Sequence, residues 1–164
     1  MNELLWMKAA KEKLGEREIT GAKHSLNILA WNKRLGAWWF NDEVPWCGSF
    51  VAICLVEAGI AIPKEWQRAL EYTKMRNTLP KPAYGCVAVK KRKGGGHVCF
   101  VAGRDKATGK LVCLGGNQNN MVCYALYDEA DFVFKWYGMH AYPNPERYQL
   151  PEFNGIKLAN VTEH

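Results

Sequence analysis

The sequence predicts an α+β fold, with helices in the first half of the chain and strands in the second. Apolar residues recur three and four positions apart over residues 50–58, which is the period of a helix. From residue 86 onward, short apolar runs alternate with clusters of Gly, Asp and Lys, a pattern typical of antiparallel strands and turns. Helices followed by a meander of strands indicate an α+β rather than a βαβ arrangement.

Four helices are expected in the first half, and capping residues and glycines mark their ends. Ser25 or Asn27 caps the second helix, and Gly36 ends it. Trp38, Trp39 and the residues up to 43 form an aromatic cluster and a polar turn. In chain order, the expected helices are residues 1–14, 28–35, 50–58 and 65–72.

Five short strands are expected in the second half, with a hairpin turn over residues 104–109. Residues 74–82 are expected to be irregular, and the proline-rich tail from Pro143 is left unassigned. In chain order, the expected strands are residues 86–89, 97–102, 111–114, 121–126 and 132–137.

Length and charge indicate one basic domain. The chain has 164 residues, 48% of them hydrophobic, and no linker or repeat divides it, so we expect a single domain over residues 1–164. Its formal charge of +6 favours an anionic partner, such as nucleic acid, a membrane surface or a cell-wall polymer. The basic run of residues 90–93 is typical of a solvated loop.

The six cysteines and the N-terminal segment favour a cytosolic origin. Three of the cysteines lie within apolar, strand-like runs, and none has the spacing of a zinc site. We therefore expect buried free thiols and no metal or other cofactor. Residues 1–14 lack the continuous apolar core of a signal peptide, and no stretch approaches the length of a membrane span.

Cys47 is the candidate nucleophile because it lies where a helix should begin. Pro45 cannot lie inside a helix, so Cys47 falls in or just before the first turn. Backbone N–H groups there lack partners and the helix dipole is positive, which helps a thiol to lose its proton. The alternative is that Cys47 is an ordinary small buried residue.

A cysteine nucleophile needs a base and a group that orients the base. Among the four histidines, His97 begins a strand directly after three glycines, which leaves space around its ring. The partner strand ends near Asn117, whose amide could fix the tautomer of His97. Gln118 or Asn119 would supply the amide instead if the strand register is shifted. Taken singly, His97 and Asn117 also fit a strand-end histidine and an ordinary turn.

Three segments resemble, in order and spacing, the motifs of the NlpC-type and CHAP-type peptidoglycan hydrolases. They look most like the small single-domain group of phages and prophages. The resemblance covers roughly residues 4–137. Cys99 stands where that family usually has glycine, and Cys86 where it often has an acidic residue. The segments are Pro-Trp-Cys-Gly-Ser-Phe-Val at 45–51, Gly-His-Val-Cys-Phe-Val at 96–101 and Leu-Gly-Gly-Asn-Gln at 114–118.

The resemblance implies a papain-like (NlpC/CHAP) α+β fold, with the cysteine on a helix packed against a small antiparallel sheet that carries the histidine. It implies that Cys47 is the nucleophile, His97 the general base and Asn117 the residue that orients the histidine. The bond cleaved would be an amide of the peptidoglycan stem peptide, or the amide between the sugar and the first stem residue. No calcium loop is visible, so no metal is expected. Trp38, Trp39 and Trp46 could line the cleft, although at least one is expected in the core.

These inferences predict a monomeric, endolysin-like enzyme whose partner is bacterial peptidoglycan, without nucleic acid or stable membrane insertion. It would be made in the host cytoplasm without a signal peptide and would act on the wall, in the periplasm or at the cell surface, after release. A virion-associated hydrolase or an injected effector fits almost as well. Two other functions stay open: a noncatalytic basic binding protein, and a papain-like hydrolase of protein substrates.

Overall fold

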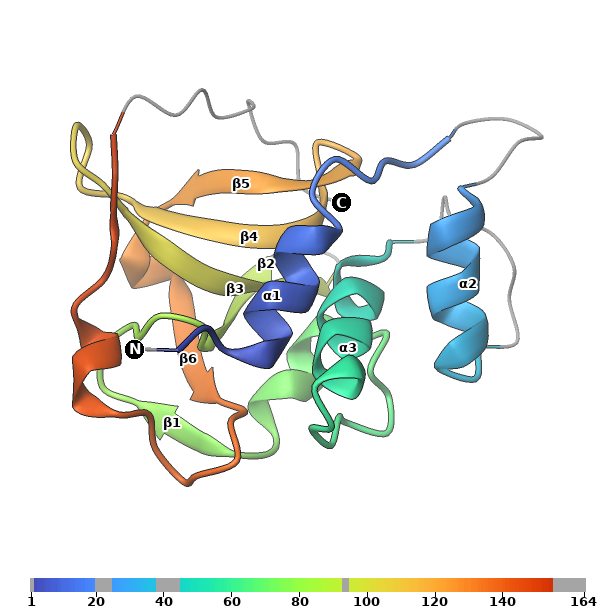
Figure 1. Ribbon diagram of the computed structural model, residues 1–164, viewed down its shortest axis with the longest axis horizontal. Coiled ribbons are helices and arrows are strands. Elements are labelled where there is room, and N and C mark those ends of the chain that lie inside the picture. The colour runs from blue at the N-terminus through green and yellow to red at the C-terminus, as the bar shows by residue number, and fades with distance from the viewer. Residues whose placement is uncertain (1, 20–24, 38–44, 93–94, 155–164) are drawn as a thin grey trace.

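The computed structural model describes residues 2–19, 25–37, 45–92 and 95–154 (Figure 1). Over these residues the protein has the α+β fold that the sequence predicts, with three α-helices and a seven-stranded sheet. The elements are α1 (Leu5–Glu12), α2 (Leu26–Arg34), α3 (Cys47–Glu57), the 3₁₀ helix η1 (Ala69–Thr73), β1 (Asn77–Leu79), β2 (Val87–Arg92), β3 (Gly95–Asp105), β4 (Leu111–Gln118), β5 (Met121–Tyr127), η2 (Glu129–Asp131), β6 (Phe132–Trp136), η3 (Pro145–Tyr148) and β7 (Glu152–Phe153).

The sheet is antiparallel except at one end of β3. Its strand order is β1-β6-β2-β3-β4-β5, and the short β7 joins the end of β3 in parallel. Asn119 and Asn120 form the two-residue connection between β4 and β5, and both have positive φ, at 53° and 60°. This is the backbone of a type I′ hairpin turn, in which asparagine is favoured.

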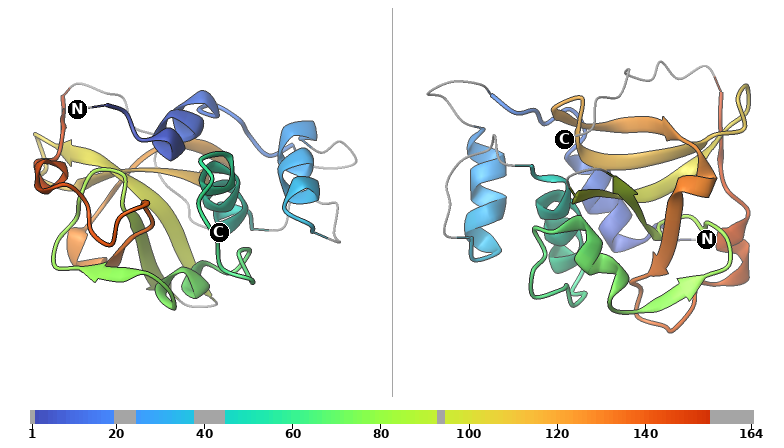
Figure 2. Two further views of the ribbon diagram at one scale, coloured as in Figure 1. Left: turned by 60° about the horizontal axis from the view of Figure 1, so that its bottom comes forward. Right: turned by 180° about the vertical axis from the view of Figure 1, so that it is seen from behind.

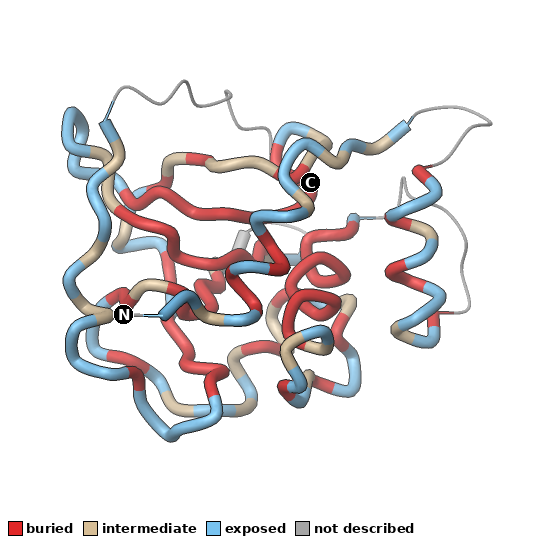
Figure 3. The backbone as a smooth tube through the Cα atoms, viewed as in Figure 1, coloured by how far each residue is buried: buried red, intermediate tan, exposed pale blue. Residues whose placement is uncertain are grey.

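Helices α1 and α3 pack against one another and against the middle of the sheet, and α2 lies beyond α3 (Figures 1 and 2). Residues 47–55 of α3 are all buried (Figure 3), because neighbours surround this helix on several sides and its residues are apolar all round. β4 approaches α3 closely at Gly116. A Cβ atom there would lie 2.5 Å from Cβ of Phe50, so only glycine fits this contact.

The first three predicted helices and all five predicted strands are confirmed, with shifts at their ends. Ser25 is the cap of α2, since its hydroxyl accepts a hydrogen bond from the backbone N–H of Ile28 at 3.3 Å. The predicted turn at 104–109 is also confirmed: the Asp105 carboxylate accepts hydrogen bonds from the backbone N–H and the hydroxyl of Thr108.

Other expectations were wrong or lie outside the described residues. The fourth helix is replaced by turns and the short η1, and the segment expected to be irregular contains β1. Most of the basic run is strand, because Lys90, Lys91 and Arg92 pair with β3. The expected aromatic cluster and polar turn fall within residues 38–44, which are not described.

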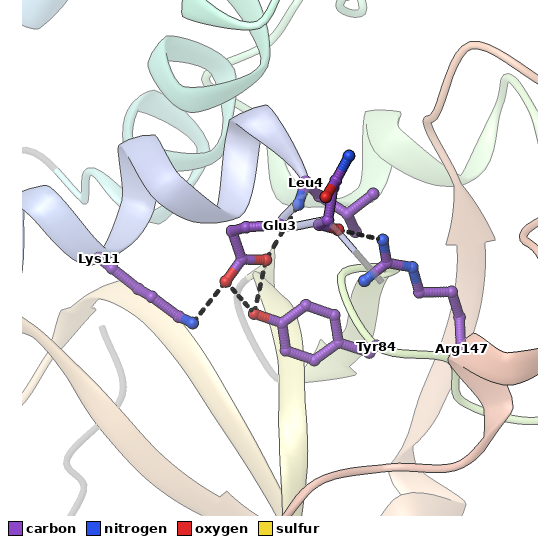
Figure 4. A network of polar contacts seen from close by, with 6 residues as sticks. Glu3, Leu4, Lys11, Tyr84 and Arg147 are labelled. Atoms are coloured by element: carbon purple, nitrogen blue, oxygen red, sulfur yellow. Dashed lines mark hydrogen bonds and ion pairs between the residues drawn. The ribbon is translucent and has the colours of Figure 1, made fainter.

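A polar network joins the residues before and in α1 to Tyr84 and to Arg147 of η3 (Figure 4). The Glu3 carboxylate accepts hydrogen bonds from Lys11 Nζ at 2.6 Å and from the Tyr84 hydroxyl at 2.9 Å. Arg147 donates to the backbone carbonyl of Asn2 at 2.7 Å. Partial burial raises the pKa of Glu3, but the hydrogen bonds from Lys11 and Tyr84 outweigh it, so the net pKa is lowered.

This network predicts a pH-dependent loss of stability for Glu3→Gln. Because the folded state lowers the pKa of Glu3, its contribution is complete above the ordinary value of 4.5 and disappears as the pH falls through the folded value. Chemical denaturation near neutral pH should show a loss of about 0.5 to 1 kcal/mol, discounted for solvent screening, and the loss should vanish in acid. Glu12→Gln, on the exposed side of α1, is the matched control. Equal losses at all pH values would contradict this assignment.

Candidate active site

α3 begins at Cys47, as the sequence predicts, with Trp46 as the residue before the first turn. The Trp46 side chain forms no cap, and its backbone carbonyl accepts a hydrogen bond from the Phe50 N–H at 3.0 Å. The backbone N–H groups of a first turn and the positive end of the helix dipole favour a negative charge at this point. Trp46 itself is 1% exposed and belongs to the core rather than to a cleft wall.

Buried contacts fix the start of α3 against the segment that follows it. A Cβ atom on Gly48 would collide with the backbone carbonyl of Trp66, so glycine permits this close approach. The hydroxyl of Tyr72 lies 2.8 Å from the Gly48 carbonyl and 3.0 Å from the Trp66 carbonyl. Burial raises the pKa of Tyr72, which keeps the hydroxyl protonated as a donor. The backbone next to Cys47 is thus held on two sides.

His97 lies on β3, and its ring is bound by side chains from β4 and β5. Its Nε2 is 3.0 Å from Oε1 of Gln118 and 3.3 Å from the hydroxyl of Tyr127. The ring is completely buried, and the Tyr127 ring packs against it at a centroid distance of 5.7 Å. The sequence pointed to His97, but gave no indication of Tyr127.

The hydrogen bonds of Gln118 assign the tautomer of His97. The Gln118 Nε2 donates to the backbone carbonyl of Cys123 at 2.7 Å, with the Cys113 carbonyl at 3.4 Å. Because both partners are acceptors, the amide nitrogen must face them and Oε1 must face His97. Oε1 can only accept, so the neutral imidazole carries its proton on Nε2. Any proton exchanged with a thiol would therefore pass through Nδ1.

The amide that is hydrogen-bonded to His97 is that of Gln118, one of the alternatives that the sequence left open, and not that of Asn117. Asn117 has a φ of +56°, and the pairing of β4 with β5 shifts between Gly115 and Gln118. This irregularity breaks the alternation of side chains, so the residue after Asn117 takes the position beside His97. The Asn117 amide is buried without a hydrogen-bond partner among the described residues.

The two glycines before Asn117 allow two different close contacts. A Cβ atom on Gly115 would lie 2.5 Å from Oε1 of Gln118, so glycine leaves the space that this carboxamide fills. Gly116 allows the contact with α3 described above. The Gly-Gly-Asn-Gln segment therefore links the helix that carries Cys47 to the amide that holds His97.

Cys47 and the residues before His97 line one pocket, of about 560 Å³. Cys47 is only 4% exposed, but it borders this space together with Gly95 and Gly96. Gly96 precedes His97 directly, so the pocket brings the start of α3 and the start of β3 together. Its other lining residues are Pro45, Gln67, Arg68, Ala69, Leu70, Glu71 and Lys74.

The six cysteines are all free, and Cys47 is the one at a helix start. Burial raises the pKa values of the Cys54, Cys86 and Cys99 thiols, which keeps them protonated and unreactive. The described residues contain no group of three or more His, Cys, Asp or Glu side chains that could hold a metal ion. No described helix has the length and apolar character needed to cross a bilayer.

Comparison with protein-family models, with curated proteins and with solved structures gave no match to this chain.

The assignment of Gln118 predicts the reactivity of Cys47. Gln118→Met keeps the length of the side chain but removes the acceptor for Nε2–H, so it should destabilise the protonated imidazole and lower the thiolate population. Alkylation of Cys47 by iodoacetamide at neutral pH should slow about tenfold, equivalent to about 1.4 kcal/mol. Peptide mapping by mass spectrometry separates Cys47 from the half-buried Cys123. Asn117→Gly, which keeps the left-handed backbone, should react like wild type; slowing in that variant alone would restore Asn117 as the orienting residue.

Proposed function

We propose that the protein is a peptidoglycan hydrolase with a papain-like (NlpC/CHAP) arrangement, which cleaves amide bonds of cell-wall stem peptides. Cys47 is the nucleophile, His97 the general base, and Gln118 takes the orienting role that the sequence gave to Asn117. The observation that carries the proposal is the hydrogen bond between Gln118 Oε1 and His97 Nε2. Cys47 and the start of β3 line the same pocket.

In the first half of the reaction, the thiol proton of Cys47 passes to Nδ1 of His97, and the sulfur attacks the carbonyl carbon of the scissile amide. The carbonyl π electrons move to oxygen, and backbone N–H groups at the start of α3 stabilise the oxyanion. The C–N bond then breaks, and the proton on Nδ1 goes to the leaving amine. Gln118 accepts from Nε2–H throughout, so it stabilises the imidazolium that forms between these steps.

In the second half, water hydrolyses the thioester. His97 takes a proton through Nδ1 as the water oxygen attacks the acyl carbon. The C–S bond breaks, the proton returns to the sulfur of Cys47, and the stem peptide leaves with a new carboxyl group. No cofactor is needed to balance these steps.

The pocket suits an extended peptide substrate. No atom lies within 4 Å of where a Cβ of Gly95 would be, so this glycine leaves room for a substrate backbone. Leu70 and Pro45 supply apolar surface. The formal charge of +6 would assist approach to an anionic wall and would make binding weaker at high salt. We further propose that the protein acts as a monomer on the wall after release from the cytoplasm where it is made.

Cys47→Ser and His97→Gln should test the enzymatic proposal on purified peptidoglycan. Loss of the thiolate or of the base should reduce release of soluble fragments at least a thousandfold, because the two groups act as one unit. His140→Gln, which changes an exposed histidine, is the control and should retain wild-type activity. Mass spectrometry of the fragments identifies whether the bond lies within the stem peptide or next to the sugar.

The same assay separates the other functions. Cleavage of protein substrates but not of peptidoglycan would favour a papain-like protease. Binding to a polyanion that is unchanged in Cys47→Ser, with no cleavage by any form, would favour a noncatalytic binding protein. Either result would overturn the proposal.

A further inference from the structure

We propose that Tyr127 is a positioning residue for His97, acting through the Gln118 carboxamide. This inference rests on the proposed function, because it assigns a further residue to the same site. Tyr127 lies on β5, two strands from β3, and nothing in the sequence motifs points to it.

The hydroxyl of Tyr127 closes a three-membered polar cluster. It donates to Oε1 of Gln118 at 3.0 Å and lies 3.3 Å from Nε2 of His97. With His97 Nε2–H as the other donor, both lone pairs of Oε1 are used. Since the Gln118 Nε2 is bound to the Cys123 carbonyl, the carboxamide is held at both ends. It cannot rotate to present its NH₂ group to His97 without losing several hydrogen bonds.

The ring of Tyr127 is itself fixed by packing. Phe132 of β6 contacts it edge-to-face at 5.3 Å between centroids, and the imidazole of His97 lies at 5.7 Å. Lys90 Nζ lies 5.2 Å from the ring centroid. Tyr127 is only 5% exposed. A phenylalanine would fill the same space, so the hydroxyl is the part of the side chain that packing does not require.

The hydroxyl therefore has a mechanistic consequence. By keeping Oε1 directed at Nε2, it maintains the tautomer in which Nδ1 is the basic nitrogen. A small displacement of a catalytic group from its productive position lowers the rate of the chemical step and leaves substrate binding intact. Tyr127 does not contact the reacting atoms in this scheme and acts only through Gln118 and the ring of His97.

Tyr127→Phe tests this proposal, with Tyr124→Phe on the same strand as the matched control. Side-chain ¹⁵N NMR of His97 should show the Nε2–H tautomer in wild type and in Tyr124→Phe, and a mixture of tautomers in Tyr127→Phe. On peptidoglycan, kcat should fall about tenfold in Tyr127→Phe with KM unchanged. In wild type, the Tyr127 hydroxyl proton should exchange slowly with solvent and show an NOE to the Nε2 proton of His97, a test that needs no variant to fold.

Four results would overturn the proposed role of Tyr127 or the proposed function. A wild-type tautomer pattern in Tyr127→Phe overturns the proposal, whether or not its activity falls. An Nδ1–H tautomer in wild type, or the absence of the NOE, overturns it as well. If wild type fails to cleave peptidoglycan, the proposed function fails, while the NMR comparison still decides whether Tyr127 positions His97.

Discussion

The candidate site depends on the hydrogen bond between Gln118 of β4 and His97 of β3. Gln118 can reach the imidazole only because Gly115 leaves space for its carboxamide and because β4 changes register at Asn117. Gly116, the residue before Asn117, lets the same strand contact the first turn of α3. A short segment of β4 thereby sets the position of the imidazole and of the helix that carries Cys47.

Local environment, and not residue type, distinguishes Cys47 from the other cysteines. Cys54 lies on the same helix two turns later, where burial raises its thiol pKa. Cys99 is two residues from His97 on β3 and is also held protonated by burial. Cys47 instead lies at the start of α3 and borders a pocket. Under the proposed function, both features would favour the thiolate that attacks the substrate.

Much of the fold could be predicted from the sequence because its signals are local. Proline, glycine and capping residues mark the start of α3 and the ends of α2, and the apolar runs mark the central strands. The short β1 and β7 were missed, and a longer helix was predicted where η1 lies, because elements of two to five residues show no clear period. Short strands also depend on pairing with distant strands. β7, for example, is defined only by its contact with the end of β3.

The candidate site could be predicted only in part, because only some of its residues have local sequence signals. Cys47 and His97 could be chosen from their places at the start of a helix and of a strand. The choice between Asn117 and Gln118 could not, because it depends on a left-handed residue and a register shift that tertiary pairing imposes. Tyr127 gave no local signal, since an aromatic residue at the end of an apolar strand is ordinarily a core residue.

Activation of Cys47 can be measured by a pH titration of ultraviolet thiolate absorbance in wild type and in Cys47→Ser. In wild type we expect one thiolate that forms well below the free-cysteine value of about 8.5, and we expect Cys47→Ser to lack it. If the two titrations coincide, and thiolate appears only in the alkaline range expected of the buried cysteines, then Cys47 is not activated and the central claim is wrong.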